Sequence, residues 1–275
     1  MVMDLPILSF TQYDLVFNVL SFTVACMFAS AAFFIAARNS IGERYRLAVT
    51  IAALAVGIAG YHYVMIFYNW VASYELSGMV YVPNGHRFND AYRYVDWILT
   101  VPLLMVELVA VLGLSKSESR SLLTRLIIAA ALMTGLGYPG EISSDNMVRF
   151  IFGVLGTLPF LYIVYVLWFE MSGALERQSE RIRVLYRNIR LLTLAAWGFY
   201  PMAYMAPLFL TSSASGEVIL QVGYSMADIL AKCGYGIIIF SIARLKTEAD
   251  RTASRPRPKG PQVPTPGPVR PGVAR

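Results

Sequence analysis

Long apolar blocks separated by short polar stretches are the main pattern along this chain. Read together with the breaker residues between them, the blocks predict seven helices. The predicted helices lie near 13–37, 46–72, 91–113, 122–138, 147–171, 188–211 and 217–244. Each holds roughly 20 residues, which is enough for a helix to cross the hydrocarbon core of a bilayer. The pattern therefore predicts an all-α membrane protein with a bundle of seven transmembrane helices.

The composition supports this interpretation. The chain has 275 residues, of which 57% are hydrophobic and 15% are charged, whereas a soluble domain is usually about 45–50% apolar and about a quarter charged. Residues 1–245 are predicted to form one membrane domain, and the Pro- and Arg-rich residues 246–275 a disordered tail.

Cys26 and Cys233 lie in apolar blocks and are expected to be packing residues without a disulfide. The opening MVMDLPILSF has no basic region or cleavage site, so no cleavable signal peptide is predicted.

The positive charges indicate an orientation in the membrane. Basic residues gather in the first, third and fifth loops and in the tail, while the other loops are acidic or neutral apart from Arg87. The positive-inside rule then places the N-terminus outside the cell and the C-terminus in the cytoplasm, for a multi-pass protein of the inner (plasma) membrane. Because the net charge of +6 is placed in this way, it does not indicate nucleic-acid binding.

Ionisable residues inside the predicted third helix are candidates for function, because a charge within a membrane span is costly. Asp96 and Thr100 are four residues apart and share a face. Glu107 lies about three turns, or ~16 Å, further along the same face, towards the cytoplasm. Arg93 lies almost one turn outward of Asp96. The alternative is a structural ion pair or a side chain that reaches the interface.

The predicted seventh helix adds Asp228 and Lys232, one turn apart on one face. A lysine in apolar surroundings tends to lose its proton or to be covalently modified. As a Schiff base with an aldehyde it would carry a cation, and two nearby carboxylates could balance its charge. Apolar surroundings favour a protonated Glu107, and a nearby cation favours an ionised Asp96, so the two acids suit a proton donor and a proton acceptor.

Three segments closely resemble the microbial (type 1) rhodopsins, seven-helix retinal proteins, over most of residues 13–244. The third helix reads RYVDWILTVPLLMVEL, similar to the proteorhodopsin and xanthorhodopsin branches. The seventh reads SMADILAKCGYG, which resembles the retinal-lysine segment, and the sixth reads WGFYPMAY, which resembles the aromatic-proline stretch beside the polyene. All three occur in the family's order, which makes the resemblance specific.

The resemblance implies a role for each buried charge. Lys232 would bind all-trans retinal through a protonated Schiff base, with Asp96 and Asp228 as counterions. Asp96 would also be the primary proton acceptor, Thr100 would form a hydrogen bond near them, and Arg93 would lie on the exit path.

The resemblance also implies the direction and the kind of transport. Glu107 would return a proton to the Schiff base from the cytoplasmic side, and His62 would pair with Asp96. The Asp-Thr-Glu triplet at 96, 100 and 107 is the pattern of outward proton pumps in this family. Chloride pumps, sodium pumps and many sensory members show other patterns. No pair of carboxylates accompanies Glu217 at the outer end of the seventh helix, so a fast proton-release group is not expected.

Other residues align with the retinal pocket of this family. They are Trp97, Leu104, Met133, Gly137, Trp197, Tyr200, Pro201 and Tyr204. Leu104 matches the apolar residue associated with green absorption, and Tyr204 replaces the tryptophan of bacteriorhodopsin. Gly153 stands where xanthorhodopsin-like members open a window for a carotenoid antenna. The alternative for Gly153 is close helix packing by a small residue.

We therefore predict a light-driven ion translocator, an outward proton pump with retinal and optionally a carotenoid, rather than an enzyme. Its partners would be protons, the lipid bilayer and further copies in a trimer or pentamer. Two alternatives are a sensory rhodopsin that signals through a transducer, and a seven-helix transporter or receptor without retinal that uses Asp228 and Lys232 as a salt bridge. The sequence contains no Gly-rich phosphate loop, metal-ligand cluster or nucleophile triad.

Overall fold

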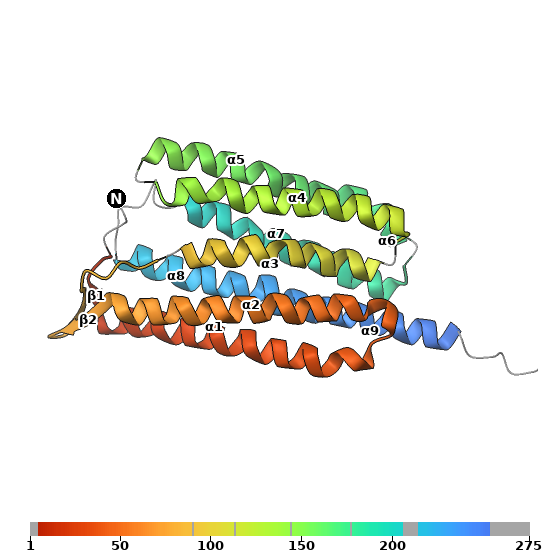
Figure 1. The fold of residues 1–275 in the computed structure, drawn as a ribbon, viewed down its shortest axis with the longest axis horizontal. Coiled ribbons are helices and arrows are strands. Elements are labelled where there is room, and N and C mark those ends of the chain that lie inside the picture. Colours follow the sequence, from red (N-terminus) through yellow and green to blue (C-terminus); the bar gives the residue numbers. More distant parts are fainter. Residues whose placement is uncertain are drawn as a thin grey trace, which may run out of the picture.

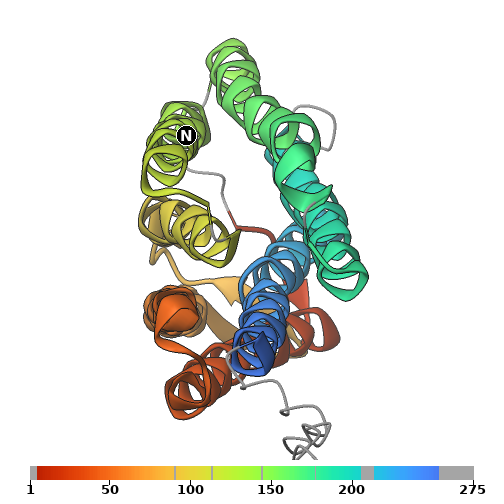
Figure 2. The ribbon, with the colours of Figure 1, turned by 90° about the vertical axis from the view of Figure 1, so that its right-hand side faces the viewer.

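Long helices lie side by side in one bundle (Figures 1 and 2). The computed structural model describes residues 5–89, 91–112, 114–143, 145–176, 178–205 and 214–253. The first four long helices are α1 (Phe10–Ala37), α2 (Glu43–Ser73), α3 (Ala91–Leu112) and α4 (Lys116–Glu141). They are followed by α5 (Asn146–Tyr165) with the π-helical turn η2 (Val166–Glu170), the short α6 (Ser172–Glu176) and α7 (Glu180–Met205). The last segment consists of α8 (Ala214–Asp228), the π-helical turn η4 (Ile229–Gly234) and α9 (Tyr235–Ala253). We call each such long helical segment, with any π-helical turn in it, a rod.

Six of these rods are long and apolar enough to cross a membrane, counted over the described residues. They comprise Phe10–Ser40, Glu43–Ser73, Ala91–Leu112, Lys116–Glu141, Asn146–Glu170 and Ala214–Ala253. The remaining rod, α7, begins with the charged segment ERIRVLYRNIR. Its predicted continuation over 206–211 lies outside the described residues.

The bundle is apolar on its outer surface and polar at selected points inside. Large side chains such as Phe22, Leu47 and Leu158 are more than half exposed, whereas Asp96, Glu107 and other charged groups are buried. In water this arrangement would be unfavourable. In a bilayer the exposed side chains meet lipid, and the helices satisfy their own backbone groups. The buried charges therefore mark the interior as the place to look for function.

Helix ends follow local sequence signals. Ser9 and Gln12 form a capping box at the start of α1, and Ser115 and Glu118 form one at the start of α4. In both, each side chain accepts a hydrogen bond from a backbone N–H that the helix leaves unpaired. Cys26 and Cys233 are free thiols, as predicted.

A small sheet joins one end of the bundle, and the sequence did not predict it. Strands β1 (Leu8–Ser9), β3 (Val80–Pro83) and β2 (Tyr74–Ser77) pair in that order, all antiparallel. Leu8 and Leu76 both lie opposite Tyr81. Gly78, with a φ of +64°, forms the β2–β3 turn, where the left-handed conformation favours glycine. These strands are too short to show a clear alternating pattern.

The last helix, α9, continues past the predicted boundary at residue 245 and ends at Ala253, so residues 246–253 are helical. Tertiary contacts hold this extension in place. The Lys246 Nζ donates a hydrogen bond to the Leu112 carbonyl at 2.9 Å, and the Thr247 hydroxyl oxygen accepts one from the Gly42 N–H at 3.0 Å. The rest of the predicted tail, 254–275, lies outside the described residues.

Candidate functional site

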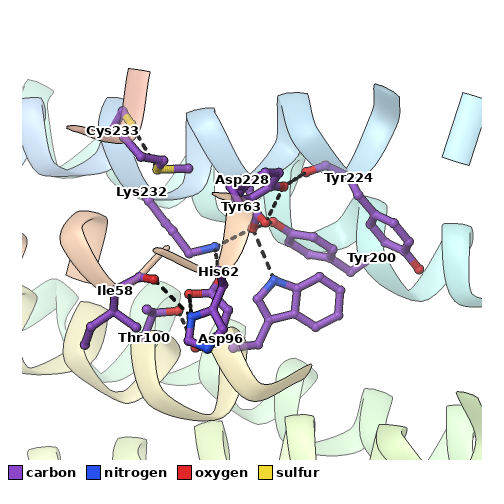
Figure 3. A network of polar contacts seen from close by, with 12 residues as sticks. Ile58, His62, Tyr63, Asp96, Thr100, Tyr200, Tyr224, Asp228, Lys232 and Cys233 are labelled. Atoms are coloured by element: carbon purple, nitrogen blue, oxygen red, sulfur yellow. Dashed lines mark hydrogen bonds and ion pairs between the residues drawn. The ribbon is translucent and has the colours of Figure 1, made fainter. Parts of the chain in front are cut away.

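The centre of the bundle holds an amine between two carboxylates (Figure 3). Lys232 lies in η4, its side chain is 2% exposed, and its Nζ is 2.5 Å from the Asp228 Oδ1 and 3.1 Å from the Asp96 Oδ2. Asp228 belongs to the same rod, but Asp96 comes from α3. π-helical turns inside longer helices occur often at functional sites. The fold thus brings together three of the charges that the sequence singled out.

Asp228 is surrounded by hydrogen-bond donors from three other helices. Its Oδ2 accepts a hydrogen bond from the Tyr63 hydroxyl at 2.7 Å. Its Oδ1 accepts one from the Tyr200 hydroxyl at 2.6 Å and one from the Trp97 Nε1 at 3.2 Å, besides the one from Lys232. Hydrogen bonds to an ionised acceptor are roughly twice as strong as neutral ones. These donors stabilise a fixed negative charge on Asp228.

Asp96 has a different environment. Its Oδ2 is near Lys232, but neither carboxyl oxygen has a hydrogen-bond partner among the described residues. The His62 Nδ1 lies 3.9 Å from the Asp96 Oδ1 and forms a hydrogen bond with the Ile58 carbonyl at 3.0 Å instead. The Thr100 hydroxyl donates to the backbone carbonyl of Asp96 at 2.9 Å, not to its carboxylate. Asp96 therefore keeps lone pairs that can accept a proton.

A chain of polar side chains begins beside the site and runs towards the β-sheet end of the bundle. The Arg93 Nη2 donates to the Gln221 Oε1 at 2.6 Å, and the Arg93 guanidinium lies 5.2 Å from the centre of the Tyr224 ring. The Gln221 Nε2 donates to the Glu217 Oε1 at 2.9 Å. Arg93 was predicted to lie on such a path. Gln221 and Tyr224 were not predicted, although both lie in the predicted seventh helix.

Glu107 lies on α3 towards the other end of the bundle. Its side chain is fully buried, and neither carboxyl oxygen has a hydrogen-bond partner within the described part of the chain. Burial without a partner disfavours the charged form of a carboxyl group. The position and surroundings of Glu107 therefore suit a proton reservoir.

An apolar cavity extends from Lys232 between α3, α4, α5 and α7. All eight residues predicted for the retinal pocket line it: Trp97, Leu104, Met133, Gly137, Trp197, Tyr200, Pro201 and Tyr204. Gly153, predicted as a carotenoid window, lines it too. Lining residues that the prediction missed include Tyr94, Thr134 and Phe160. Tyr63, which also went unpredicted, directly follows His62 in the sequence. Its place next to the candidate His62 in an apolar segment is the sequence signal that could have identified Tyr63.

Residues 16–245 match the family model described as bacteriorhodopsin-like protein. This chain belongs to the bacteriorhodopsin-like family. The predicted family membership and the predicted all-α membrane fold are thereby confirmed. The chain is accordingly a multi-pass membrane protein, and proteins of this family bind retinal.

Several relatives of this rhodopsin are informative. The solved structure of xanthorhodopsin, a light-driven ion pump with dual chromophore, is 50% identical, covers 90% of this chain and 99% of its own, and superposes with a TM-score of 0.87. A green-light absorbing proteorhodopsin from Gamma-proteobacterium EBAC31A08 is 27% identical over 220 residues, which are 80% of this chain and 82% of the relative. Sensory rhodopsin-2 of Natronomonas pharaonis is 28% identical over 225 residues, 80% of this chain and 85% of the relative. The chain is thus similar both to a rhodopsin that pumps ions and to a sensory rhodopsin.

The cavity of this rhodopsin fits retinal. Retinal is an apolar polyene with an aldehyde at one end, and the cavity is lined mainly by apolar and aromatic side chains with the Lys232 amine at one end. Asp96 and Asp228 lie where a cation at Nζ needs counterions. Trp97 and Tyr200 line the cavity and also form hydrogen bonds to Asp228, so they would fix both the cofactor and its counterion.

Gly153 permits a close approach between α5 and α7. A Cβ atom at this position would lie 2.7 Å from the Tyr204 Cε1 and would also meet the end of Met205. Real Cβ contacts are not this short, so a larger residue would displace these side chains. The observation supports close packing at Gly153, and Gly153 lines the cavity as well.

Proposed function

We propose that this rhodopsin is a light-driven outward proton pump with retinal bound covalently to the Nζ of Lys232. The observation that carries the proposal is the unequal surroundings of the two counterions. The Asp228 carboxylate accepts hydrogen bonds from four side chains, whereas the Asp96 carboxylate has an ion contact with Lys232 and no hydrogen-bond partner among the described residues. One carboxylate is built to stay charged and the other to accept a proton. Glu107, buried on the other side of Lys232, supports a proton donor.

Retinal bound at Lys232 would supply absorption of visible light and a double bond that light can isomerise. Asp96 is placed to receive the proton of Nζ at its Oδ2, which lies 3.1 Å away. Arg93, Gln221 and Glu217 continue outward from this point and provide groups that can hold or pass a proton. Glu107 releases its own proton towards Nζ and is reprotonated from the opposite end of the bundle.

His62 and Thr100 act through Asp96 in this proposal. His62 is 3.9 Å from the Asp96 carboxylate, close enough for a small movement or a water to join the two groups. Thr100 holds the backbone of α3 at Asp96. His62 thus tunes the acceptor, and Thr100 fixes its position.

The orientation and assembly complete the proposal. The positive-inside rule places the N-terminus outside and the C-terminus in the cytoplasm of the inner (plasma) membrane, so that Glu107 faces the cytoplasmic half. The exposed apolar faces of the bundle are compatible with a trimer or pentamer in the bilayer. A carotenoid antenna beside Gly153 is a further part of the proposal, and the dual chromophore of xanthorhodopsin supports it.

The main alternative is a sensory rhodopsin, which the similarity to sensory rhodopsin-2 favours. Glu107 favours the pump, because a sensor does not need rapid reprotonation. A transporter or receptor without retinal is the second alternative, and it predicts no visible absorption band after retinal is added.

The deciding experiment is the light-induced pH change of unbuffered cells that express the chain with retinal. We expect acidification of the medium that a protonophore abolishes. Replacing Asp96 with Asn should abolish acidification while a visible band remains. A visible pigment that changes no pH would refute the pump and leave the sensory alternative.

A further inference from the structure

One buried cation, Arg149, takes no part in the proton transfer proposed above. It lies in the first turn of α5 and is 6% exposed, at the β-sheet end of the bundle (Figure 1). A charge buried in a membrane span is costly and is therefore a candidate for function. The Arg149 Nη1 lies 3.4 Å from the Glu141 Oε2, and its Nη2 donates a hydrogen bond to the Glu141 carbonyl at 3.0 Å. Because Glu141 is the last residue of α4, Arg149 joins the start of α5 to the end of α4.

The same guanidinium also holds Tyr204, which comes from α7. The Arg149 Nη1 donates to the Tyr204 carbonyl at 3.4 Å, and the guanidinium carbon lies 5.6 Å from the centre of the Tyr204 ring. In return, the Tyr204 hydroxyl donates to the Arg149 carbonyl at 3.3 Å. A guanidinium can serve several acceptors at once because its five donors are held in one plane. Arg149 therefore fixes both the backbone of α7 at Tyr204 and the direction of the Tyr204 ring.

The Tyr204 ring fills a gap that two glycines leave. A Cβ at Gly153 on α5 would lie 2.7 Å from the Tyr204 Cε1, and a Cβ at Gly140 on α4 would collide with the Tyr204 hydroxyl oxygen. The ring thus lies directly against the backbones of both helices. Packed interiors leave such a ring few other positions, and the hydrogen bonds with Arg149 select one of them.

Tyr204 lies in the part of the cavity wall where the ring of retinal would be. Tyr204 and Gly153 both line the cavity. The turn η4, which carries Lys232, packs against α1, α2 and α7, whereas α4 and α5 lie on the side of the bundle away from α1 and α2 (Figure 2). Retinal that is bonded to Lys232 through its aldehyde would therefore point its ring towards α4 and α5.

We propose that Arg149 is a positioning residue of the retinal pocket, which holds the Tyr204 ring as the wall at the ring end of the cofactor. Glu141 balances the buried charge of Arg149 and orients its guanidinium. Arg149 itself is not among the described residues that line the cavity, so it acts on retinal only through Tyr204. The inference rests on retinal at Lys232 and does not depend on the direction or the existence of proton transport.

The test measures how firmly the pocket holds retinal in the dark. The nitrogen of added hydroxylamine takes the place of Nζ, so that retinal leaves as its oxime and the Lys232 amine is restored. Arg149→Gln should speed this release by about tenfold, the factor that the loss of one hydrogen bond gives. It should also shift the absorption maximum, because the Tyr204 ring beside the cofactor changes position.

Tyr204→Phe removes the partner hydroxyl and leaves Arg149 in place. It should change the release rate and the absorption maximum in the same direction as Arg149→Gln. Since both residues act through one ring, the double variant should release retinal no faster than the faster single variant. Additive effects of the two changes would count against the proposal.

Arg125→Gln is the matched control. Arg125 on α4 also forms an ion pair, with Glu170 at 2.7 Å, and donates a hydrogen bond to the Tyr162 hydroxyl at 3.2 Å. None of these three is among the described residues that line the cavity. We expect the parental release rate and absorption maximum. Release as fast as in Arg149→Gln would show a general loosening of the bundle and would overturn the proposal.

Parental release and absorption in Arg149→Gln would also overturn the proposal. Arg149→Gln leaves the Glu141 charge buried without its cation, which is strongly destabilising. If that variant forms no pigment, Arg149→Gln combined with Glu141→Gln removes both charges and takes its place, with the same expected outcomes. Failure of the proposed function is visible separately, as a parental pigment that does not acidify the medium in light, and it leaves this dark test unaffected.

Discussion

The hydrogen bond from Tyr63 to Asp228 should be one of the strongest single side-chain contributions to stability. The Tyr63 hydroxyl is 2.7 Å from the Asp228 Oδ2 and 3.4 Å from the Tyr224 carbonyl, so its single proton belongs to the carboxylate. The hydrogen bonds from Lys232, Trp97 and Tyr200 all go to the other carboxyl oxygen, Oδ1. A hydrogen bond to a charged group contributes roughly 1.5–3 kcal/mol, and we expect Tyr63→Phe to lower the free energy of unfolding by about that amount.

Two other tyrosines make the expectation specific. Tyr200→Phe should cost only about 0.5–1.5 kcal/mol, because the Asp228 Oδ1 keeps its bonds from Lys232 and Trp97. Tyr74→Phe should cost nothing or stabilise slightly, since the Tyr74 hydroxyl has no partner among the described residues. All three changes remove one oxygen atom.

The assay is reversible unfolding of the retinal-bound protein in mixed detergent micelles, followed by far-ultraviolet circular dichroism and by the visible band. The expected order of losses is Tyr63, then Tyr200, then Tyr74. A loss for Tyr63→Phe no larger than that for Tyr74→Phe would refute the reasoning, because both residues are buried and only their partners differ.

Three further predictions use matched changes. Lys232→Ala should abolish the visible band in reconstitution with retinal, and an intact band would disprove the covalent site. Because the change leaves two buried carboxylates without their cation, it should also lower the free energy of unfolding by roughly 3–5 kcal/mol. Gly153→Ala should destabilise by about 1–3 kcal/mol, because its Cβ would lie 2.7 Å from a ring on α7. Gly135→Ala, where nothing lies within 4 Å of the Cβ, should be neutral or stabilising in the same thermal unfolding assay, and equal effects would contradict the packing argument. Lys246→Met should speed backbone hydrogen exchange in α9, because it removes the hydrogen bond to the Leu112 carbonyl. Arg244→Met should not, since the Arg244 side chain is 66% exposed and a surface ion pair such as Arg244–Glu248 contributes about 0–1 kcal/mol.

The sequence by itself determined the membrane class, most helices and the candidate charges. Apolar blocks of bilayer length are a local property, and the partition of such blocks into lipid does not depend on their neighbours. Asp96, Asp228 and Lys232 stood out because a charge in such a block is rare. Residues aligned with known motifs, such as Trp97 and Tyr204, also proved to line the cavity.

Only the tertiary structure decided how unequal the two counterions are. Asp96 and Asp228 are the same residue type in similar apolar segments, and the sequence could not show that Tyr63 and Tyr200, from two other helices, both donate to Asp228. The same holds for α9, which continues past the predicted boundary because Lys246 binds the end of α3. Hydrogen bonds between residues far apart in the chain depend on which faces of the packed helices meet, and no local pattern records that arrangement.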